Sequence, residues 1–358
     1  MAKSRRQDRE KRPDIFKQWQ AGDWKDEHTL KDRRRLTPKR HVKKDLEVSL
    51  EAFDTMGWGR VLEVHRRSTV VAIENAEVED YARCRLAPFL DLTDYSAVTV
   101  GDWVQVSKLK QGGEEFITDI RPRVSKLSRP GPDDREHREQ ILAVNIDQIV
   151  VVSSVLQPAF NAGLIDRYLV AAEYSNIPLV LVLNKMDLAD ELPEELEDFK
   201  AIADKVVPVS VVSGEGLEEL REVLKDHFSV FTGSSGVGKS SLVNKLIPGL
   251  DIRIGDVREK DGKGRHTTTS STLLELPWGG AVIDTPGIRG MGLWDLKPSD
   301  LANVFPAFEP WFGNCKFSNC SHLHEPECAI IDAIEEGELS VARFHSYERI
   351  MTTLEGRK

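Results

Sequence analysis

The sequence of 358 residues lacks the long apolar runs of membrane proteins, because no stretch approaches the ~20 residues that span a bilayer. Cysteine is scarce: the chain has four, and three of them fall between positions 315 and 328. A secreted disulfide scaffold would have more cysteines and would spread them. The first residues, MAKSRRQDREKR, are charged throughout and lack the apolar core of a signal peptide. We therefore expect a soluble, cytoplasmic protein without a membrane partner.

Basic charge does not dominate either, since 49 lysines and arginines face 59 aspartates and glutamates, for a formal net charge of −10. This balance excludes a protein that coats nucleic acid with its whole surface. The charge is nevertheless uneven, because residues 1–44 hold 16 basic and 7 acidic side chains, a net of +9, and the remainder carries −19. A basic arm on an acidic body predicts a local anionic partner. RNA is the leading candidate, DNA is not expected, and a solvated tail without a partner is the alternative.

Short β-type segments follow the arm and are separated by turn residues such as Gly101-Asp102 and Gly112-Gly113. Five such strands predict a small closed barrel, and the OB-fold is the commonest five-stranded form. Oligonucleotide binding is a frequent use of that barrel, although a fold alone does not establish it. Cys84 in the third segment fits a small buried hydrophobe. The expected strands are Gly59–Val64, Thr69–Glu74, Tyr81–Leu86, Trp103–Leu109 and Glu115–Ile120.

A second region begins after the Pro- and Arg-rich segment Arg121–Asp134, which we interpret as a linker. Continuous aliphatic runs at Ile149–Val152 and Leu179–Leu183 are typical of buried parallel strands, and Leu164–Tyr174 has a helical pattern. This alternation predicts an α/β domain, in which helices cover a parallel sheet. Further strands are expected at Val206–Val211, Ser229–Thr232 and Ala281–Ile283.

The strongest motif is a phosphate-binding loop, GSSGVGKS, which fits GxxxxGK(S/T) between a strand-like and a helix-like segment. Its glycines let the backbone curl so that N–H groups face phosphate oxygens, and the helix that begins near Ser241 adds its N-terminus. Lys239 is expected to bind the β and γ phosphates and Ser240 to ligate Mg²⁺. The loop indicates a nucleoside triphosphate without specifying the base. Its residues are Gly233, Ser234, Ser235, Gly236, Val237, Gly238, Lys239 and Ser240.

The base is indicated by the tetrapeptide Asn184-Lys185-Met186-Asp187, at the carboxyl end of the strand that precedes it. The Asp187 carboxylate can accept hydrogen bonds from guanine N1–H and from its exocyclic amine. Adenine offers no such pair of donors, so a buried carboxylate discriminates against it. Downstream, Ser213-Gly214 begins the segment SGEGL, which resembles the loop that supports guanine O6 through a backbone N–H; a simple turn before a helix is the alternative. Together with the phosphate loop, these segments predict a guanine nucleotide.

Two further segments complete the set. DTPG at 284–287 fits the DxxG pattern, in which Asp284 orients the Mg²⁺ shell and the Gly287 N–H senses the γ-phosphate. GRHTTT at 264–269 offers Thr268 as a second Mg²⁺ ligand, with Thr267 and Thr269 as alternatives. Ordinary GTPases carry the phosphate loop first and the base-reading segments last, whereas here NKMD and SGEGL come first. The elements are therefore complete but circularly permuted, which leaves a site intact when the new ends lie in an exposed loop.

Three cysteines and a histidine gather near the C-terminus. Cys315, Cys320 and Cys328 supply three soft sulfurs within fourteen positions, and His322 or His324 can add an imidazole. A closed Cys₃His shell binds Zn²⁺ in a structural role, because no position remains for a reactive water. Three free thiols are the alternative. The residues that follow, 329–336 and 341–354, are helical in pattern.

The series NKMD, SGEGL, GSSGVGKSS, GRHTTT and DTPG resembles the circularly permuted GTPases, specifically the ribosome small-subunit-dependent GTPase A family. The flanking phrases VNIDQ at 144–148 and LIDRYL at 164–169 agree, and the resemblance spans about residues 55–350. It implies GTP/GDP, Mg²⁺ and one structural Zn²⁺ as cofactors, with His322 as the fourth zinc ligand. It also implies that barrel and tail bind the small (30S) ribosomal subunit and its rRNA during late maturation, and that the subunit stimulates hydrolysis.

The group that drives hydrolysis is less clearly marked. Ras-like enzymes place a glutamine after the DxxG glycine to orient water, and this chain has Ile288 there. His266 is the nearest titratable side chain, so the predicted catalytic set is His266, Thr268 and Lys239; contact with RNA or packing is the alternative role of His266. Gly236 stands where potassium-activated relatives have asparagine, so potassium dependence does not follow. We expect slow intrinsic hydrolysis that a partner completes.

The expected organisation is a basic arm at 1–48, an OB-type barrel at 49–122, a permuted α/β GTPase domain at 123–298 and a zinc-binding helical domain at 299–358. We expect a monomer. The leading hypothesis is a GTPase that acts in late maturation of the small ribosomal subunit. The alternative is a guanine-nucleotide-gated RNA-binding module with negligible turnover, which Ile288 favours.

Overall fold

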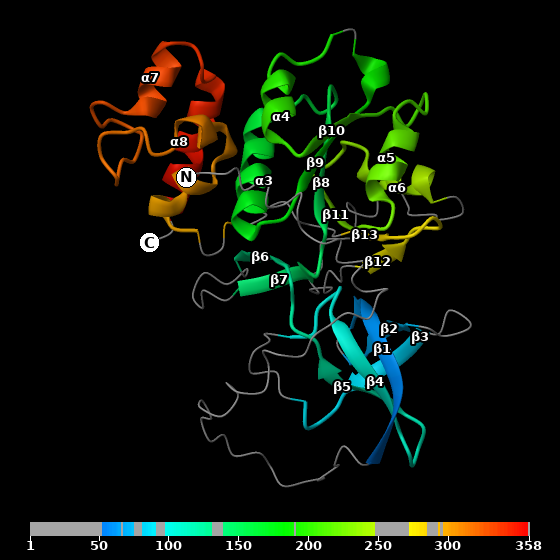
Figure 1. Ribbon diagram of the computed structural model, residues 1–358. Helices are drawn as coiled ribbons and strands as arrows, with labels where there is room; N and C mark the ends of the chain where they lie inside the picture. Colours follow the sequence, from blue (N-terminus) through cyan, green and yellow to red (C-terminus); the bar gives the residue numbers. More distant parts are fainter. Residues whose placement is uncertain are drawn as a thin grey trace, which may run out of the picture.

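The computed structural model describes residues 52–65, 67–74, 81–90, 97–130, 139–189, 191–247, 272–284, 293 and 296–356. Figure 1 shows a β-barrel beneath an α/β domain, and a small helical module beside helix α3 of that domain. The predicted basic arm lies outside the described residues. Within the part of the chain that is described, no helix is both long enough and apolar enough to cross a membrane.

The barrel is a closed five-stranded sheet, as predicted. Antiparallel pairs join β1 to β2, β2 to β3, β4 to β5 and β1 to β4, and a short parallel pairing of β3 with β5 completes the circuit. Val61, Val71 and Cys84 fill the interior with zero exposure, and Cys84 alternates along β3 with exposed residues. Burial raises the pKa of the Cys84 thiol to about 12, which agrees with an inert buried side chain. The strands are β1 (Phe53–Val64), β2 (Thr69–Ile73), β3 (Tyr81–Leu86), β4 (Trp103–Leu109) and β5 (Glu115–Ile120).

The expected linker at Arg121–Asp134 contains a strand, so that interpretation was wrong in part. Strand β6 (Lys126–Pro130) pairs antiparallel with β7 (Glu139–Val144) in a two-stranded sheet between the barrel and the α/β domain (Figure 1). The physical reason is burial, since Leu127 is 1% exposed and lies opposite the fully buried Ala143. One apolar side chain among prolines and arginines was too weak a pattern to predict this strand.

The α/β domain has a six-stranded sheet in the order β10-β9-β8-β11-β13-β12, in which only β12 runs antiparallel to its neighbour. The predicted alternation of strands and helices is confirmed, although β10 ends at Pro208, three residues earlier than expected. Helices α3 and α4 pack on one face of the sheet, and α5 and α6 pack on the other (Figure 1). The strands are β8 (Gln148–Ser154), β9 (Leu179–Asn184), β10 (Lys205–Pro208), β11 (Phe228–Thr232), β12 (Thr272–Glu275) and β13 (Ala281–Asp284). The helices are α3 (Ala162–Ser175), α4 (Leu196–Ile202), α5 (Leu217–Leu224) and α6 (Lys239–Leu246), and a short 3₁₀ turn, η2, covers Met186–Leu188.

The barrel joins this domain through backbone and through one buried arginine. Strand β1 pairs with β12 at Glu63 and Thr272, so the two sheets form one continuous sheet of eleven strands. The Arg60 side chain is 7% exposed, donates to the Asn145 carbonyl at 2.8 Å and lies 3.1 Å from the Phe228 ring centroid. Burial lowers the pKa of Arg60, and the charges of two nearby aspartates act against this shift.

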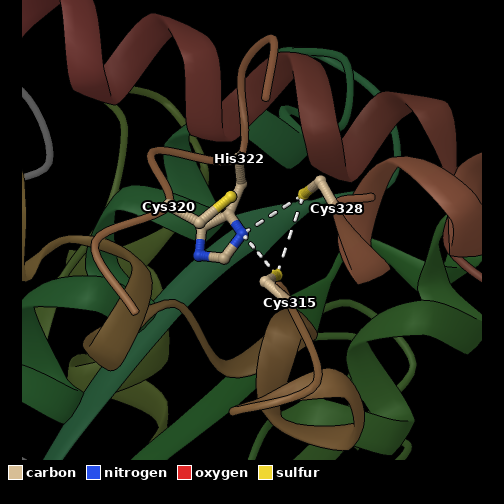
Figure 2. Close-up of side chains that lie close together, drawn as sticks. All are labelled: Cys315, Cys320, His322 and Cys328. Atoms are coloured by element: carbon tan, nitrogen blue, oxygen red, sulfur yellow. Dashed lines mark hydrogen bonds between the residues drawn. The ribbon is translucent and has the colours of Figure 1, made fainter. Parts of the chain in front are cut away.

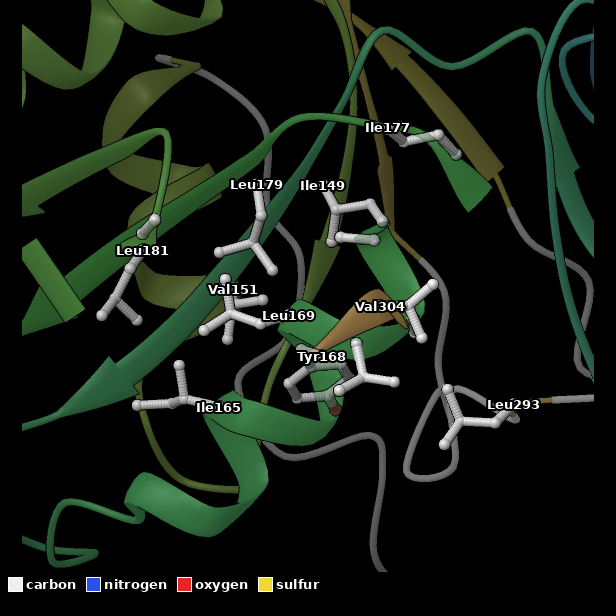
Figure 3. Close-up of a cluster of buried hydrophobic side chains, with 14 of the residues drawn as sticks. Ile149, Val151, Ile165, Tyr168, Leu169, Ile177, Leu179, Leu181, Leu293 and Val304 are labelled. Carbon is white, nitrogen blue, oxygen red and sulfur yellow. The ribbon is translucent and has the colours of Figure 1, made fainter. Parts of the chain in front are cut away.

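The C-terminal module shares the core of the α/β domain. A single hydrophobic cluster runs from the inner side chains of β8 and β9 through α3 into Val304, and it includes Tyr347 and Cys328 (Figure 3). Val304 and Leu293 are drawn in this view among the side chains of the same cluster. The module consists of η3 (Pro298–Asp300), η4 (Ala302–Val304), η5 (Pro306–Trp311), α7 (Ala329–Glu335) and α8 (Val341–Glu355). The predicted helical tail is confirmed.

Candidate nucleotide site and metal centre

The phosphate loop connects β11 to α6 and requires its outer glycines for steric reasons. Gly233 has a φ of +138°, and a Cβ there would lie 2.0 Å from the Val152 carbonyl oxygen. Gly238 has a φ of +96°, and a Cβ there would lie 2.4 Å from Nδ2 of Asn184. Any larger residue would therefore push the loop away from the sheet. The loop is held close to the strand ends by both contacts.

Lys239 folds back over this loop. Its ammonium donates to the carbonyl oxygens of Gly233 at 2.9 Å and Ser234 at 2.7 Å, which places the charge inside the curve of the backbone. Ser235 and Gly236 are exposed at the tip, and Val237 is 1% exposed and anchors the loop beneath. Ser240 and Ser241 follow in the first turn of α6 and are half-buried. The arrangement leaves backbone N–H groups, one ammonium and the start of a helix on the same side, which suits a polyphosphate.

The predicted base-reading segment lies against the phosphate loop. The Asn184 side chain is 2% exposed, and its Nδ2 donates to the Val237 carbonyl at 2.8 Å. Lys185 has a φ of 64° and its ammonium donates to the Gln157 carbonyl. These two side chains therefore hold neighbouring loops in place. Asp187, in the following 3₁₀ turn, is exposed, whereas the sequence argument assumed a buried carboxylate.

Ser210 is a functional residue that the sequence analysis missed. Its side chain is fully buried, and its hydroxyl donates to Asp187 Oδ1 at 2.6 Å. The same hydroxyl accepts from the Ser213 N–H at 3.0 Å, and the Gly214 N–H donates to the Ser210 carbonyl at 2.9 Å. Ser213 and Gly214 thus shape the turn, while Ser210 fixes the carboxylate. A hydroxyl directly after an apolar strand, at the sheet edge where Asp187 lies, is the signal that could have indicated it.

The segments at 264–269 and 284–287, predicted to contact the γ-phosphate and Mg²⁺, lie outside the described residues except for the backbone of Asp284. The backbone of Asp284 ends β13 opposite Phe231 of β11, next to the phosphate loop. The Asp284 side chain, Gly287 and Ile288 lie outside the described residues, as do His266 and the threonines at 267–269. Their predicted roles stay predictions.

The candidate metal centre brings Cys315, Cys320, His322 and Cys328 together, with their ligand atoms all within 4.8 Å of one another. His322 Nδ1 lies 3.4 Å from Cys315 Sγ and 3.5 Å from Cys328 Sγ, and these two sulfurs are 3.9 Å apart (Figure 2). Zn–S bonds of about 2.3 Å and Zn–N bonds of about 2.0 Å at tetrahedral angles require ligand separations of roughly 3.5–3.8 Å. The donor set and its spacing therefore fit a four-coordinate zinc ion.

The surroundings of this centre also suit a metal. Burial lowers the pKa of His322, which favours the neutral imidazole that binds metals. Burial raises the pKa of Cys320 to about 12 and raises that of Cys328, so a cation is needed to hold these thiolates. Tyr347 of α8 donates to the Ser321 carbonyl at 2.9 Å and fixes the loop that carries His322. The competing His324 lies outside the cluster, and its backbone N–H donates to Glu325 Oε2 at 3.3 Å.

Comparisons with known proteins find relatives that cover most of the chain. The RsgA GTPase family matches residues 120–294. A protein of Mannheimia succiniciproducens named small ribosomal subunit biogenesis GTPase RsgA is 39% identical over 327 residues, 89% of this chain and 90% of that relative. A protein of the same name from Haemophilus influenzae is 41% identical over 89% of this chain and 91% of that relative.

Solved structures show the same architecture and the same permuted order. The crystal structure of YjeQ from Thermotoga maritima superposes with a TM-score of 0.67 at 32% identity, over 84% of this chain and 99% of that one. The structure of YloQ, described as a circularly permuted GTPase, superposes with a TM-score of 0.64 at 26% identity, over 87% of this chain and 98% of that one. Sequence, fold and site geometry lead to one conclusion: the chain belongs to the RsgA GTPase family.

Proposed function

We propose that this chain is a GTPase that binds the small ribosomal subunit and acts in its late maturation, hydrolysing GTP to GDP and phosphate with stimulation by the subunit. The proposal of GTP binding and hydrolysis rests on the contact between the base-reading segment and the phosphate loop. Asn184, in the base-reading segment, holds the Val237 carbonyl of the phosphate loop, so base and phosphates are recognised by one rigid unit. The names of the relatives in the family support the ribosomal part.

Guanine selection rests on Asp187. Ser210 donates to one of its oxygens, which fixes the orientation of the carboxylate. A fixed carboxylate accepts from guanine N1–H and from the exocyclic amine, whereas adenine would leave it unpaired and desolvated. Asp187→Asn should therefore weaken GDP binding and favour xanthine nucleotides. A variant that binds ATP and GTP as the parent does would contradict the guanine assignment.

The loop backbone, Lys239 and a magnesium ion would bind the phosphates of the nucleotide. Ser240, at the start of α6, and Thr268 would ligate that ion, and Asp284 would orient its shell. Mg²⁺ neutralises charge that develops on the phosphates. We propose that the Gly287 N–H senses the γ-phosphate and that His266 orients or deprotonates the attacking water, since Ile288 has no group that could do so.

The remaining parts would serve binding to the subunit. We propose that the barrel at 49–122 and the zinc-binding module at 299–358 contact rRNA as a monomeric factor, with the GTPase domain at 123–298 between them. One structural zinc ion would hold the C-terminal module, because Cys315, Cys320, His322 and Cys328 close its coordination shell. The basic arm at 1–48 would add phosphate contacts in the cytoplasm, where such a factor acts.

The decisive experiment is GTP hydrolysis with Mg²⁺, measured alone, with purified small subunits and with large subunits as the control. Stimulation by small subunits only is expected. Binding of GTP without stimulation would instead favour a guanine-nucleotide-gated RNA binder with negligible turnover. His266→Ala should then separate chemistry from binding, since it should lower the stimulated rate while leaving the affinity for GTP unchanged.

A further inference from the structure

The zinc-binding module at 299–358 is called the zinc module below. Its helix α8 packs beside α3 (Figure 1), and a buried ion pair joins the two helices. Arg343 Nη1 donates to Asp166 Oδ1 at 2.6 Å, and each side chain is 2% exposed. The guanidinium carbon of Arg343 also lies 4.2 Å from the Phe199 ring centroid of α4. Its Nε is 3.7 Å from Asp198 Oδ2 on the same helix. One side chain of the zinc module thus fixes α8 to two helices of the α/β domain.

The opposite side of α3 holds the phosphate loop. Asp166 and Tyr168 are two positions apart, which separates them by roughly 200° around the helix axis. Tyr168 is 2% exposed, and its hydroxyl interacts with the Thr232 side chain and with the backbone of Gly233. Gly233 is the first residue of the phosphate loop. Helix α3 is therefore clamped by the zinc module on one side and contacts the start of the nucleotide site with the other.

The N-terminal end of α3 also reaches the nucleotide site. Asn161 caps this helix, since its Oδ1 accepts from the Leu164 N–H at 3.0 Å. In the loop before it, the Gln157 carbonyl accepts from the Lys185 ammonium. Pro158 Cδ lies 3.8 Å from the place that a Cβ on Gly236 would occupy. A shift of α3 would therefore disturb the base-reading segment and the phosphate loop together.

We infer that Arg343 is a positioning residue for nucleotide binding: it clamps Asp166 on α3, and α3 in turn holds the Thr232–Gly233 corner through Tyr168. A buried ion pair is a directional attachment that gives less net stability than an apolar contact of equal volume, so its selection fits a role in fixing the position of α3. Nucleotide affinity then depends on a docked zinc module, and bound nucleotide strengthens that docking to the same degree. This coupling goes beyond the proposed function and needs no ribosome.

The test uses the full, zinc-loaded chain and a fluorescent GDP analogue. Arg343→Met keeps the volume and removes the clamp, and it should weaken GDP binding about tenfold, mainly through faster dissociation. Tyr168→Phe removes only the hydroxyl and should weaken binding by about threefold. The double variant should weaken it by less than the product of the two factors, because both changes break the same connection. Arg343→Lys should restore part of the affinity.

Lys200→Met is the matched control, because Lys200 on α4 forms an exposed ion pair with Glu197 at 2.6 Å and should bind GDP like the parent. Zinc content is measured for every variant. A zinc-loaded Arg343→Met that binds GDP within about twofold of the parent would overturn the inference. Strictly multiplicative effects in the double variant would overturn it as well. If Arg343→Met does not fold, Arg343→Lys and Tyr168→Phe carry the test, and parent-like GDP affinity in both overturns it.

Discussion

The barrel and the zinc module are attached to the GTPase domain in opposite ways. The barrel has its own buried core, which includes Val61, Val104 and Ile117, whereas its buried Leu62 and Val100 join the GTPase core. In the described part of the zinc module, every buried apolar residue belongs to the cluster that runs through α3. The barrel is therefore a folded body added at the edge of a sheet. The zinc module is an extension of the GTPase core, and its four metal-ligand side chains lie close together within it.

Metal removal should produce the largest difference between the barrel and the zinc module. Structural zinc contributes about 10–16 kcal/mol to the folding of zinc-finger peptides, so a chelator should unfold the region around α7 and α8. Barrel amides such as those of Val61 and Val104 should keep their protection, which hydrogen exchange read by mass spectrometry would report. Cys328→Ser should reproduce the effect, whereas Cys84→Ala should leave the zinc content unchanged. Loss of barrel protection together with that of α8 would contradict two separate cores.

Arg60→Ala should loosen the barrel attachment and cost about 2–4 kcal/mol of unfolding free energy, because it leaves the buried Asn145 carbonyl without its side-chain donor. The stacking of Arg60 on Phe228 is lost as well. Urea titration would measure the change. The matched control is Arg85→Ala on β3. Arg85 forms an exposed ion pair with Glu114 at 3.5 Å, and its loss should change the unfolding free energy by less than about 0.5 kcal/mol. Equal effects of both variants would mean that Arg60 does not hold the junction.

The zinc-module interface should respond to pH because burial raises the pKa of Asp166 to about 6, despite the counteracting charge of Arg343. A carboxyl whose folded-state pKa lies above its unfolded value stabilises the fold at low pH, and the contribution is lost as pH rises through about 6. The parent should therefore lose about 1 kcal/mol relative to an Asp166→Asn/Arg343→Met double variant between pH 5 and pH 7. Thermal or urea unfolding across that range measures it. A stability difference that stays constant between pH 5 and pH 7 would show that Arg343 keeps Asp166 ionised throughout.

Tyr81→Phe should have the smallest effect. The Tyr81 hydroxyl of β3 donates to Glu275 of β12 at 3.1 Å across the barrel junction, and both groups are exposed. Such a bond contributes about 0.5 kcal/mol or less, so the melting temperature should stay within about 2 °C of that of the parent. A larger loss would show that side chains, and not the β1–β12 backbone pairing, carry this edge of the junction.

Local pattern was enough to predict much of this molecule. The glycines at 233 and 238 and the Asn184–Asp187 segment form local patterns of a few residues. Spacing alone therefore indicated two segments that the structure brings into contact. The barrel followed from five alternating segments, and the metal centre from ligands within fourteen positions. Strand β6 was missed because only Leu127 marks it, and Ser210 because one hydroxyl after a strand has no distinct pattern.

Contacts between distant segments could not be predicted. Arg343 and Asp166 are 177 residues apart, and in sequence each looks like an ordinary surface charge on a helix. Arg60 likewise lies in a strand with no sign of the Phe228 ring that covers it. Such pairs form when complete helices and strands pack against one another, and the periodicity of the sequence carries no information about that packing. The switch residues and the basic arm stay predictions.

The pairing of β1 with β12 also protects the protein from self-association. An open strand edge offers unpaired N–H and C=O groups to any passing chain, and natural sheets cover or shorten such edges. At the far edge, β10 has four residues and ends in Pro208, which cannot donate to a neighbour. At the near edge, the barrel itself is the cover. A GTPase domain cut free of its barrel would therefore expose β12 as a template for aggregation, even with its nucleotide site intact.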